Sequence, residues 1–131
     1  MSIKKGILYQ VHYPKKSWVE EISRVYEKNE SGFFPEKKYE GEIENGEPNG
    51  DGILTYTDEG TYVGQFVNGL REGIGTMTWG RMAIVHGYVY EGHWKNDEIH
   101  GQGTMTDPKG IKMKGKWIDG EAQDGHRRVI D

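Results

Sequence analysis

The residues that could carry out catalysis are scattered along this chain. The chain has no cysteine, which excludes thiolate nucleophiles, disulfides and Cys-ligated metal sites. Its four serines lie outside any Gly-x-Ser-x-Gly context. The histidines do not form the His-Glu-x-x-His pattern of zinc hydrolases; they are His12, His86, His93, His100 and His126. We therefore expect a protein that is not an enzyme and has no catalytic residue, cofactor or metal site.

Phosphate binding is the chemistry that the remaining residues could support. Glycine pairs such as Gly50/Gly52 lie among turn residues, whereas a phosphate loop needs glycines between a strand and the start of a helix. A cluster of lysines is a better candidate for contact with phosphate or acidic lipid headgroups: Lys109, Lys112, Lys114 and Lys116. On an extended strand Lys114 and Lys116 would share one face. The alternative interpretation is a solvated, charged surface.

The elements that position these residues come from an internal repeat. Its anchors, spaced 23, 28 and 23 residues apart, are Tyr39, Tyr62, Tyr90 and Met113. Two residues after each anchor comes a glycine: Gly41, Gly64, Gly92 and Gly115. Seven residues after each anchor come Gly46, Gly69, Asp97 and Gly120. A further glycine pair follows in the first three units. Coincidences at so many fixed offsets indicate a true repeat.

Each unit is predicted to be one β-hairpin. An alternating segment such as residues 39–44 is typical of a half-buried strand, Asn45-Gly46 favours a tight turn, and residues 52–56 form a second strand. On the first strands, the buried face carries the anchors, then the glycines, then Ile43, Phe66, Trp94 and Trp117. On the second strands it carries Leu54, Met77 and Met105, and two residues further on Tyr56, Trp79 and Asp107. The tyrosines, Gly41, Gly64, Gly92, Gly115, Phe66, Trp94 and Trp117 are therefore assigned to the structure of the repeat.

The pattern Tyr-x-Gly-x4-Gly-x3-Gly-x-Gly, from Tyr39 to Gly52 and from Tyr62 to Gly75, resembles the MORN (membrane occupation and recognition nexus) repeat. A third copy has Asp97 in place of one glycine, and a fourth is degraded. The resemblance implies a mainly β fold: a single-layer antiparallel β-hairpin solenoid. It also implies roles in protein contact, self-association or attachment to acidic phospholipids. We expect units at 39–61, 62–89, 90–112 and 113–125, followed by a tail at 126–131.

Residues 1–38 differ from the repeat and are predicted to form an N-terminal cap. An alternation over residues 7–13, ended by Pro14, indicates a strand: Ile7, Tyr9, Val11 and Tyr13 alternate with Leu8, Gln10 and His12. Ser17 followed by Glu20 is a capping-box signature. Trp18, Ile22, Val25 and Tyr26 then give one apolar face of a helix over about residues 18–28. We expect this short strand and α-helix to cover the open end of the array; docking to a membrane or partner is the alternative.

The 28-residue spacing inserts five residues near Arg81–His86. Apolar side chains are unusual in a free loop, so the candidate contacts for a partner are Trp79, Met82, Ile84, Val85 and His86. An extended hairpin that packs on its own neighbour is an equal alternative. Residues 39–60 contain seven acidic residues and no lysine or arginine, and this could support head-to-tail self-association with the lysine-rich end.

Composition bounds the function further. The net charge of −4 argues against nucleic-acid binding. Because no signal-peptide core or membrane-spanning run is present, we expect a cytoplasmic protein, with peripheral membrane attachment as an alternative. The leading prediction is a non-catalytic module that contacts a protein of unknown identity or forms homo-oligomers. The alternatives are weak binding of acidic lipid through the lysine cluster with Lys4, Lys5, Lys15 and Lys16, and an accessory domain of a larger enzyme. The initial methionine favours a complete small protein over such a domain.

Overall fold

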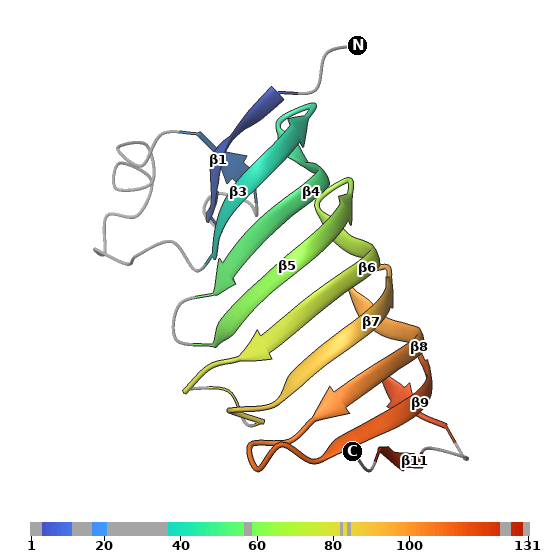
Figure 1. Cartoon of the computed structure of the whole chain (residues 1–131). Coiled ribbons are helices and arrows are strands. Elements are labelled where there is room, and N and C mark those ends of the chain that lie inside the picture. Colours follow the sequence, from blue (N-terminus) through green and yellow to red (C-terminus); the bar gives the residue numbers. More distant parts are fainter. Residues whose placement is uncertain are drawn as a thin grey trace.

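The computed structural model describes residues 4–11, 17–20, 37–56, 59–81, 83, 85–123 and 127–129. These residues form one antiparallel sheet in a single layer (Figure 1). The sheet order is β10-β9-β8-β7-β6-β5-β4-β3-β1-β2, and β11 also pairs with β9. The strands are β1 (Lys4–Val11), β2 (Ser17–Val19), β3 (Lys37–Glu44), β4 (Glu47–Tyr56), β5 (Gly60–Val67), β6 (Leu70–Trp79), β7 (Val89–Lys95), β8 (Glu98–Thr106), β9 (Lys112–Ile118), β10 (Glu121–Ala122) and β11 (Arg127–Val129).

The predicted hairpins are confirmed as β3–β4, β5–β6, β7–β8 and the short β9–β10. Asn45 and Gly46, with φ of 55° and 74°, give the first turn the two positive φ angles of a type I′ turn. Each of the three later turns is also bonded to the preceding hairpin, because the N–H groups of Gly69, Asp97 and Gly120 donate to the carbonyls of Pro48, Arg71 and Ile99. The hairpin ends are thus linked along the array.

One face of the sheet, here called the inner face, holds the core. Tyr39, Tyr62 and Tyr90 are completely buried. Their rings alternate with those of the next column in edge-to-face contacts: Tyr39–Phe66 at 5.0 Å, Phe66–Tyr62 at 5.1 Å, Tyr62–Trp94 at 5.2 Å, Trp94–Tyr90 at 5.5 Å and Tyr90–Trp117 at 5.3 Å between centroids. Such pairs contribute about 0.5–1.5 kcal/mol each beyond burial. Contacts between neighbouring units therefore stabilise the array.

The glycines leave space for these rings. A Cβ added at Gly75 would lie 2.1 Å from Oη of Tyr62, so the tyrosine lies directly over the glycine of its own unit. The hydroxyl then donates to the carbonyl of Gln65 at 3.0 Å. In register, one row of glycines crosses the sheet: Gly6, Gly41, Gly52, Gly64, Gly75, Gly92, Gly103 and Gly115.

The N-terminal region corrects one prediction. The strand predicted over residues 7–13 is confirmed for residues 7–11, which belong to β1; residues 12 and 13 lie outside the described part of the chain. Strand β1 pairs with β3 and places Gly6 opposite Gly41. The helix over about residues 18–28 is wrong at its start, because Ser17–Val19 form β2 and pair with Tyr9–Val11. Trp18 packs edge-on against Tyr39 at 6.4 Å, and this burial outweighs the local capping signal. Residues 21–28 lie outside the described part of the chain.

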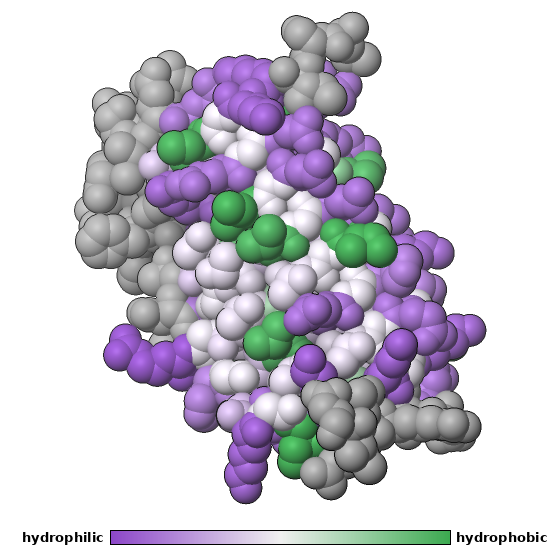
Figure 2. Space-filling model, in the orientation of Figure 1, coloured by the Kyte–Doolittle hydropathy of each residue, from purple (hydrophilic) through white to green (hydrophobic). Residues whose placement is uncertain are grey.

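The opposite, outer face is mostly polar. Its exposed apolar side chains include Ile7, Ile53 and Val63. On the face turned to the viewer in Figure 2, apolar side chains form small separate groups among hydrophilic and near-neutral residues. The described part of the array therefore buries its aromatic columns on the inner face and keeps its other face mostly polar.

Candidate functional site

A cavity of about 420 Å³ opens on the inner face beside the insertion. Strands β4 and β6 contribute its walls and floor, and the segment between β6 and β7 contributes one rim. Its lining residues are Tyr56, Glu59, Arg71, Met77, Trp79, Ala83 and Val85. Ligand sites are commonly concave and mostly apolar with a few placed polar groups, so this is the candidate binding site.

The cavity exists because a side chain is missing from one row of the sheet. Tyr56 pairs in register with Gly60, and Gly60 pairs with Trp79. The corresponding positions two residues before the other tyrosine anchors carry Lys37 and Tyr88. With glycine between them, the two aromatic residues flank an open space two strand spacings wide, about 9.6 Å.

The rim is held in place by backbone hydrogen bonds. Glu59 donates its N–H to the carbonyl of Tyr56 at 3.4 Å and accepts from the N–H of Gly80 at 2.9 Å. In the insertion, Ala83 donates to Gly80, His86 donates to Ala83, and the N–H of Gly87 bonds to the carbonyl of Trp79. The described residues of the insertion therefore form consecutive turns against the end of β6.

Two charged groups of opposite sign border the cavity. The guanidinium of Arg71 is mostly buried and lies 4.5 Å from the ring centroid of Trp94. It is paired with Asp97, whose Oδ1 lies 2.6 Å from Nε, and it also donates to the Asp97 carbonyl at 2.7 Å. The positive charge of Arg71 is therefore compensated by Asp97. A second pair of opposite charges borders the cavity region, because Glu59 lies at the rim and the Lys37 ammonium lies 5.1 Å from the ring centroid of Tyr56.

Tyr56 is the polar wall of the cavity. Its Oη is buried and has no hydrogen-bond partner among the described residues. Burial raises the pKa of this phenol to about 12, although the nearby Arg71 charge lowers it. The hydroxyl is thus neutral at neutral pH, and the surrounding atoms enclose it.

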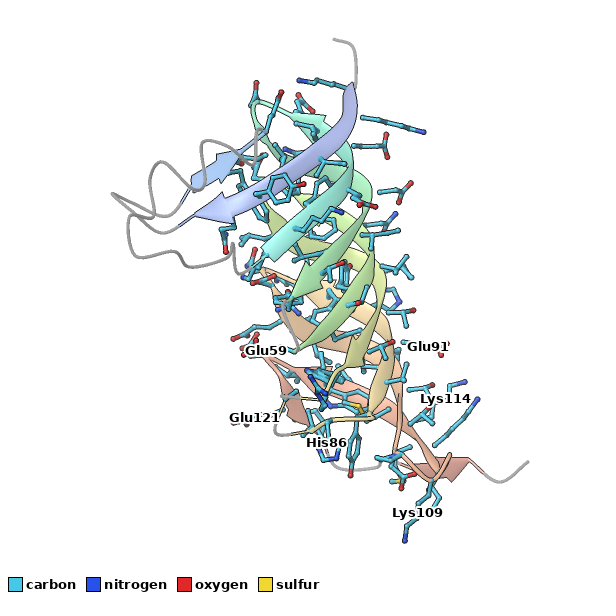
Figure 3. All side chains as sticks on the ribbon, turned by 90° about the vertical axis from the view of Figure 1, so that its left-hand side faces the viewer. Glu59, His86, Glu91, Lys109, Lys114 and Glu121 are labelled. Carbon is cyan, nitrogen blue, oxygen red and sulfur yellow. The ribbon has the colours of Figure 1, made fainter. Side chains whose placement is uncertain are left out.

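The structure brings two of the five predicted partner contacts to this cavity: Trp79 and Val85. His86 is exposed in the turn that follows, and it lies on the same side of the sheet as Glu59, opposite Glu91 (Figure 3). Met82 and Ile84 lie outside the described residues. The contact role itself stays a prediction for all five.

Sequence reasoning missed Tyr56, Glu59 and Arg71. A signal was available for Arg71, because the equivalent positions in the other units are Pro48, Ile99 and Ala122. Asp97 gave a second signal, since it replaces the turn glycine and has a φ of 71°. Asp97 and Arg71 depart from the repeat together because their side chains form the ion pair.

The predicted lysine cluster lies elsewhere, on and beside β9. Lys112, Lys114 and Lys116 occupy alternate positions of this strand and are exposed, so they share its outer face and span about 14 Å. Lys109 lies in the preceding turn. Lys4 and Lys5 are on β1, about 34 Å away across the sheet, and Lys4 is paired with Glu20 at 2.6 Å. Lys15 and Lys16 lie outside the described residues.

Other kinds of site were sought in the described part of the chain. It contains no group of three or more His, Asp or Glu side chains placed to hold a metal ion. Nor does it contain a helix with the length and apolar content needed to cross a bilayer.

The sequence profile of the MORN repeat matches this chain at residues 39–61, 62–81 and 90–112, which together make up about half of it. The chain belongs to the MORN repeat family. The second match ends at the start of the insertion, so the rim residues Ala83 and Val85 lie outside the matched repeats. Alsin from Rattus norvegicus and from Homo sapiens is 35% identical to the chain over 81 residues, or 62% of its length. That stretch is 5% of alsin, so the chain corresponds to a small part of these relatives.

Proposed function

We propose that this MORN protein is a non-catalytic interaction module that docks a partner protein on the inner face of its sheet. The cavity between Tyr56 and Trp79 is the observation that supports this function. It combines an aromatic and aliphatic lining with few polar groups, and aromatic residues dominate the energetics of protein interfaces. The half-exposed Val85 at its rim adds an apolar contact.

Affinity capture from the native host, with quantitative mass spectrometry, tests this proposal. Val85→Asp would place a charge at the rim. Val63→Asp is the matched control, because Val63 is similarly exposed, 51% against 43% for Val85, but lies on the outer face. We expect wild type and Val63→Asp to retain the same protein and Val85→Asp to lose it at least tenfold. Equal retention by all three proteins would contradict docking at the cavity.

Self-association is another form of the same function, in which the docked protein is a second copy. Light scattering of the purified protein across a concentration series distinguishes the two forms. A dimer that dissociates on Val85→Asp but persists in Val63→Asp would identify the second copy as the occupant.

Binding to acidic phospholipid headgroups is the second candidate function, supported by the lysine row on β9. Lysines near an anionic surface contribute about 1 kcal/mol each, so Lys112, Lys114 and Lys116 together would strengthen binding by roughly 100-fold. Several outer-face residues oppose it by repelling an anionic membrane: Glu40, Glu42, Asp51 and Glu91. This balance ranks lipid binding below protein docking.

Co-sedimentation with phosphatidylserine-containing vesicles at moderate salt tests the lipid function. We expect wild type to pellet and the Lys112/Lys114/Lys116→Glu variant to remain in solution. Reversal of Lys4 and Lys5 at the far end of the sheet is the control for net charge. Absence of pelleting by wild type, or equal loss in both variants, would remove the β9 row as a lipid site.

A further inference from the structure

The outer face of the sheet carries opposite charges at its two ends. Two rows of side chains cross this face in register from β3 to β9. One row is Glu40, Ile53, Val63, Thr76, Glu91, Thr104 and Lys114, and the other is Lys38, Thr55, Thr61, Thr78, Val89, Thr106 and Lys112. Between β3 and β9 these rows consist of threonine, isoleucine and valine, with Glu91 as the exception. Glu91 and Lys114 point from the same side of the sheet, away from Glu59 (Figure 3).

The acidic end of this face is also hollowed. A cavity of about 640 Å³ opens there over the glycines of β3, β4 and β5. Its charged lining is Glu40, Glu42, Asp51 and Lys5. Even with Lys38, whose Nζ lies 2.8 Å from Glu40, this end has more acidic than basic groups. At the other end Lys112, Lys114 and Lys116 lie on β9, beside uncharged outer positions of β8.

The two charged ends are equally far from β6. Glu40 lies three strands before Thr76 and Lys114 lies three strands after it, about 14 Å away on each side. A two-fold axis along β6, between two facing copies of the chain, therefore places Glu40 of each copy over Lys114 of the other. Rotation about a strand also preserves the direction of the sheet twist, so the two twisted faces run parallel to each other.

We propose that two copies of this chain pair through the outer faces of their sheets, in antiparallel orientation. The β9 lysines of each copy enter the acidic hollow of the other, so this contact is made twice. Glu91 meets β5 of the second copy, where the Gln65 amide offers an N–H donor because its Oε1 already accepts from the N–H of Ile74 at 2.7 Å. The inner face stays exposed, so the pairing goes beyond the docking proposed above and does not depend on it.

The size of the shared face predicts a weak dimer. Seven strands by five residues cover about 34 Å by 17 Å on each copy, so the pair buries roughly 1,100 Å² in total. Specific interfaces begin at about 1,000 Å². We therefore expect a dissociation constant in the micromolar range and strong dependence on salt.

Sedimentation velocity of the full chain, over a concentration series at low salt, tests the proposal. We expect wild type to reach the mass of a dimer and no more. Glu40→Lys and Lys114→Glu should each raise the dissociation constant at least about tenfold, because the dimer contains the contact twice and like charges replace opposite ones. Glu40→Lys combined with Lys114→Glu should restore dimerisation to within about threefold of wild type. Since the two positions are about 29 Å apart within one copy, this recovery reports a contact between copies.

Val63→Asp and Val85→Asp separate the two faces of the sheet. Val63 lies on β5, which faces β7 of the second copy, so Val63→Asp should place a charge near Glu91 and abolish the dimer. Val85→Asp should leave the dimer intact, because Val85 lies at the inner cavity. All four substituted side chains are exposed, and thermal unfolding shows whether each variant is folded.

Three results would overturn the proposal: a monomer at every concentration, growth beyond a dimer, or failure of the charge swap to restore dimerisation. So would a dimer that Val85→Asp dissociates and Val63→Asp spares, since the copies would then meet through their inner faces. If the dimer test fails while Val85→Asp still abolishes capture of a protein, inner-face docking stands and only outer-face pairing falls. If both fail, both are wrong.

Discussion

Tyr62 packs directly over Gly75, and this contact permits a sharp test of the repeat architecture. In Gly75→Ala the new methyl carbon would lie 2.1 Å from Oη and 2.3 Å from Cζ of Tyr62. The ring cannot move freely, because Tyr62 is completely buried and packs edge-on against both Phe66 and Trp94. Displacing it also breaks the hydrogen bond from Tyr62 to the Gln65 carbonyl.

The cost follows from these contacts. Overpacking of a core costs about 1–3 kcal/mol. A lost hydrogen bond adds about 1 kcal/mol, and each weakened aromatic pair adds about 0.5–1.5 kcal/mol. These terms overlap, so we expect Gly75→Ala to lower the free energy of unfolding by about 3–5 kcal/mol. For a chain of this length, that corresponds to a fall in Tm of roughly 10–20 °C.

Gly46→Ala separates this clash from the general cost of replacing a glycine. A Cβ at Gly46 would have nothing within 4 Å, but its φ is 74°, so conformational strain alone should cost about 1 kcal/mol. Thermal unfolding followed by tryptophan fluorescence compares the two variants. If Gly75→Ala lowers Tm no more than Gly46→Ala, the tyrosine does not lie over the glycine as described. A second check is Tyr62→Leu, which should reduce the penalty of Gly75→Ala by at least 1 kcal/mol in the double variant.

Two further predictions concern charge. Asp97→Gly should change the free energy of unfolding by less than about 1 kcal/mol, because relief of the positive φ offsets loss of the Arg71 ion pair. Asp97→Ala keeps the positive φ and also loses the ion pair, so in urea unfolding it should cost about 1 kcal/mol more than Asp97→Gly. Burial raises the pKa of Tyr39, Tyr56 and Tyr90 to about 12 from the ordinary 10.0. The folded state therefore holds these phenolic protons more tightly than the unfolded state, and their stabilising contribution is complete below pH 10 and is lost as the pH rises toward 12. Phenolate absorbance and circular dichroism recorded together should show these tyrosines ionising as the sheet unfolds; their ionisation near pH 10 in a fully folded sheet would contradict the assignment.

Much of the fold could be predicted because the repeat encodes it at every level. The anchors and glycines recur at fixed offsets, and strand side chains alternate between faces. The inner columns of Tyr62, Phe66 and Trp94 follow directly. The helix prediction failed because it relied on local signals at Ser17 and on apolar spacing, whereas pairing with β1 and burial of Trp18 against Tyr39 decided the conformation. Gly6-Ile7-Leu8 repeats the order of Gly52-Ile53-Leu54, so the place of β1 in the array had a sequence signal.

The candidate site was harder to predict, because a cavity depends on what is absent from a row. Trp79 and Val85 were found through the irregular repeat spacing. Tyr56 was not, since its column otherwise appeared to belong to the core. Only the register shows that Gly60 separates Tyr56 from Trp79 and leaves the space between them open.

The departures from the repeat converge on this one place. Repeat units whose only role is to pack against their neighbours are interchangeable. A residue that departs from the repeat pattern in one unit and costs stability therefore has no structural explanation there. Asp97 occupies a left-handed turn position that glycine fills in the other units, and Arg71 puts a charge where the others have Pro48, Ile99 and Ala122. Arg71 lines the cavity beside the insertion and the missing side chain at Gly60, and Asp97 is paired with Arg71. Backbone strain and buried charge beside an open cavity are typical of functional positions. They favour the middle of the inner face, rather than either end of the array, as the proposed docking region.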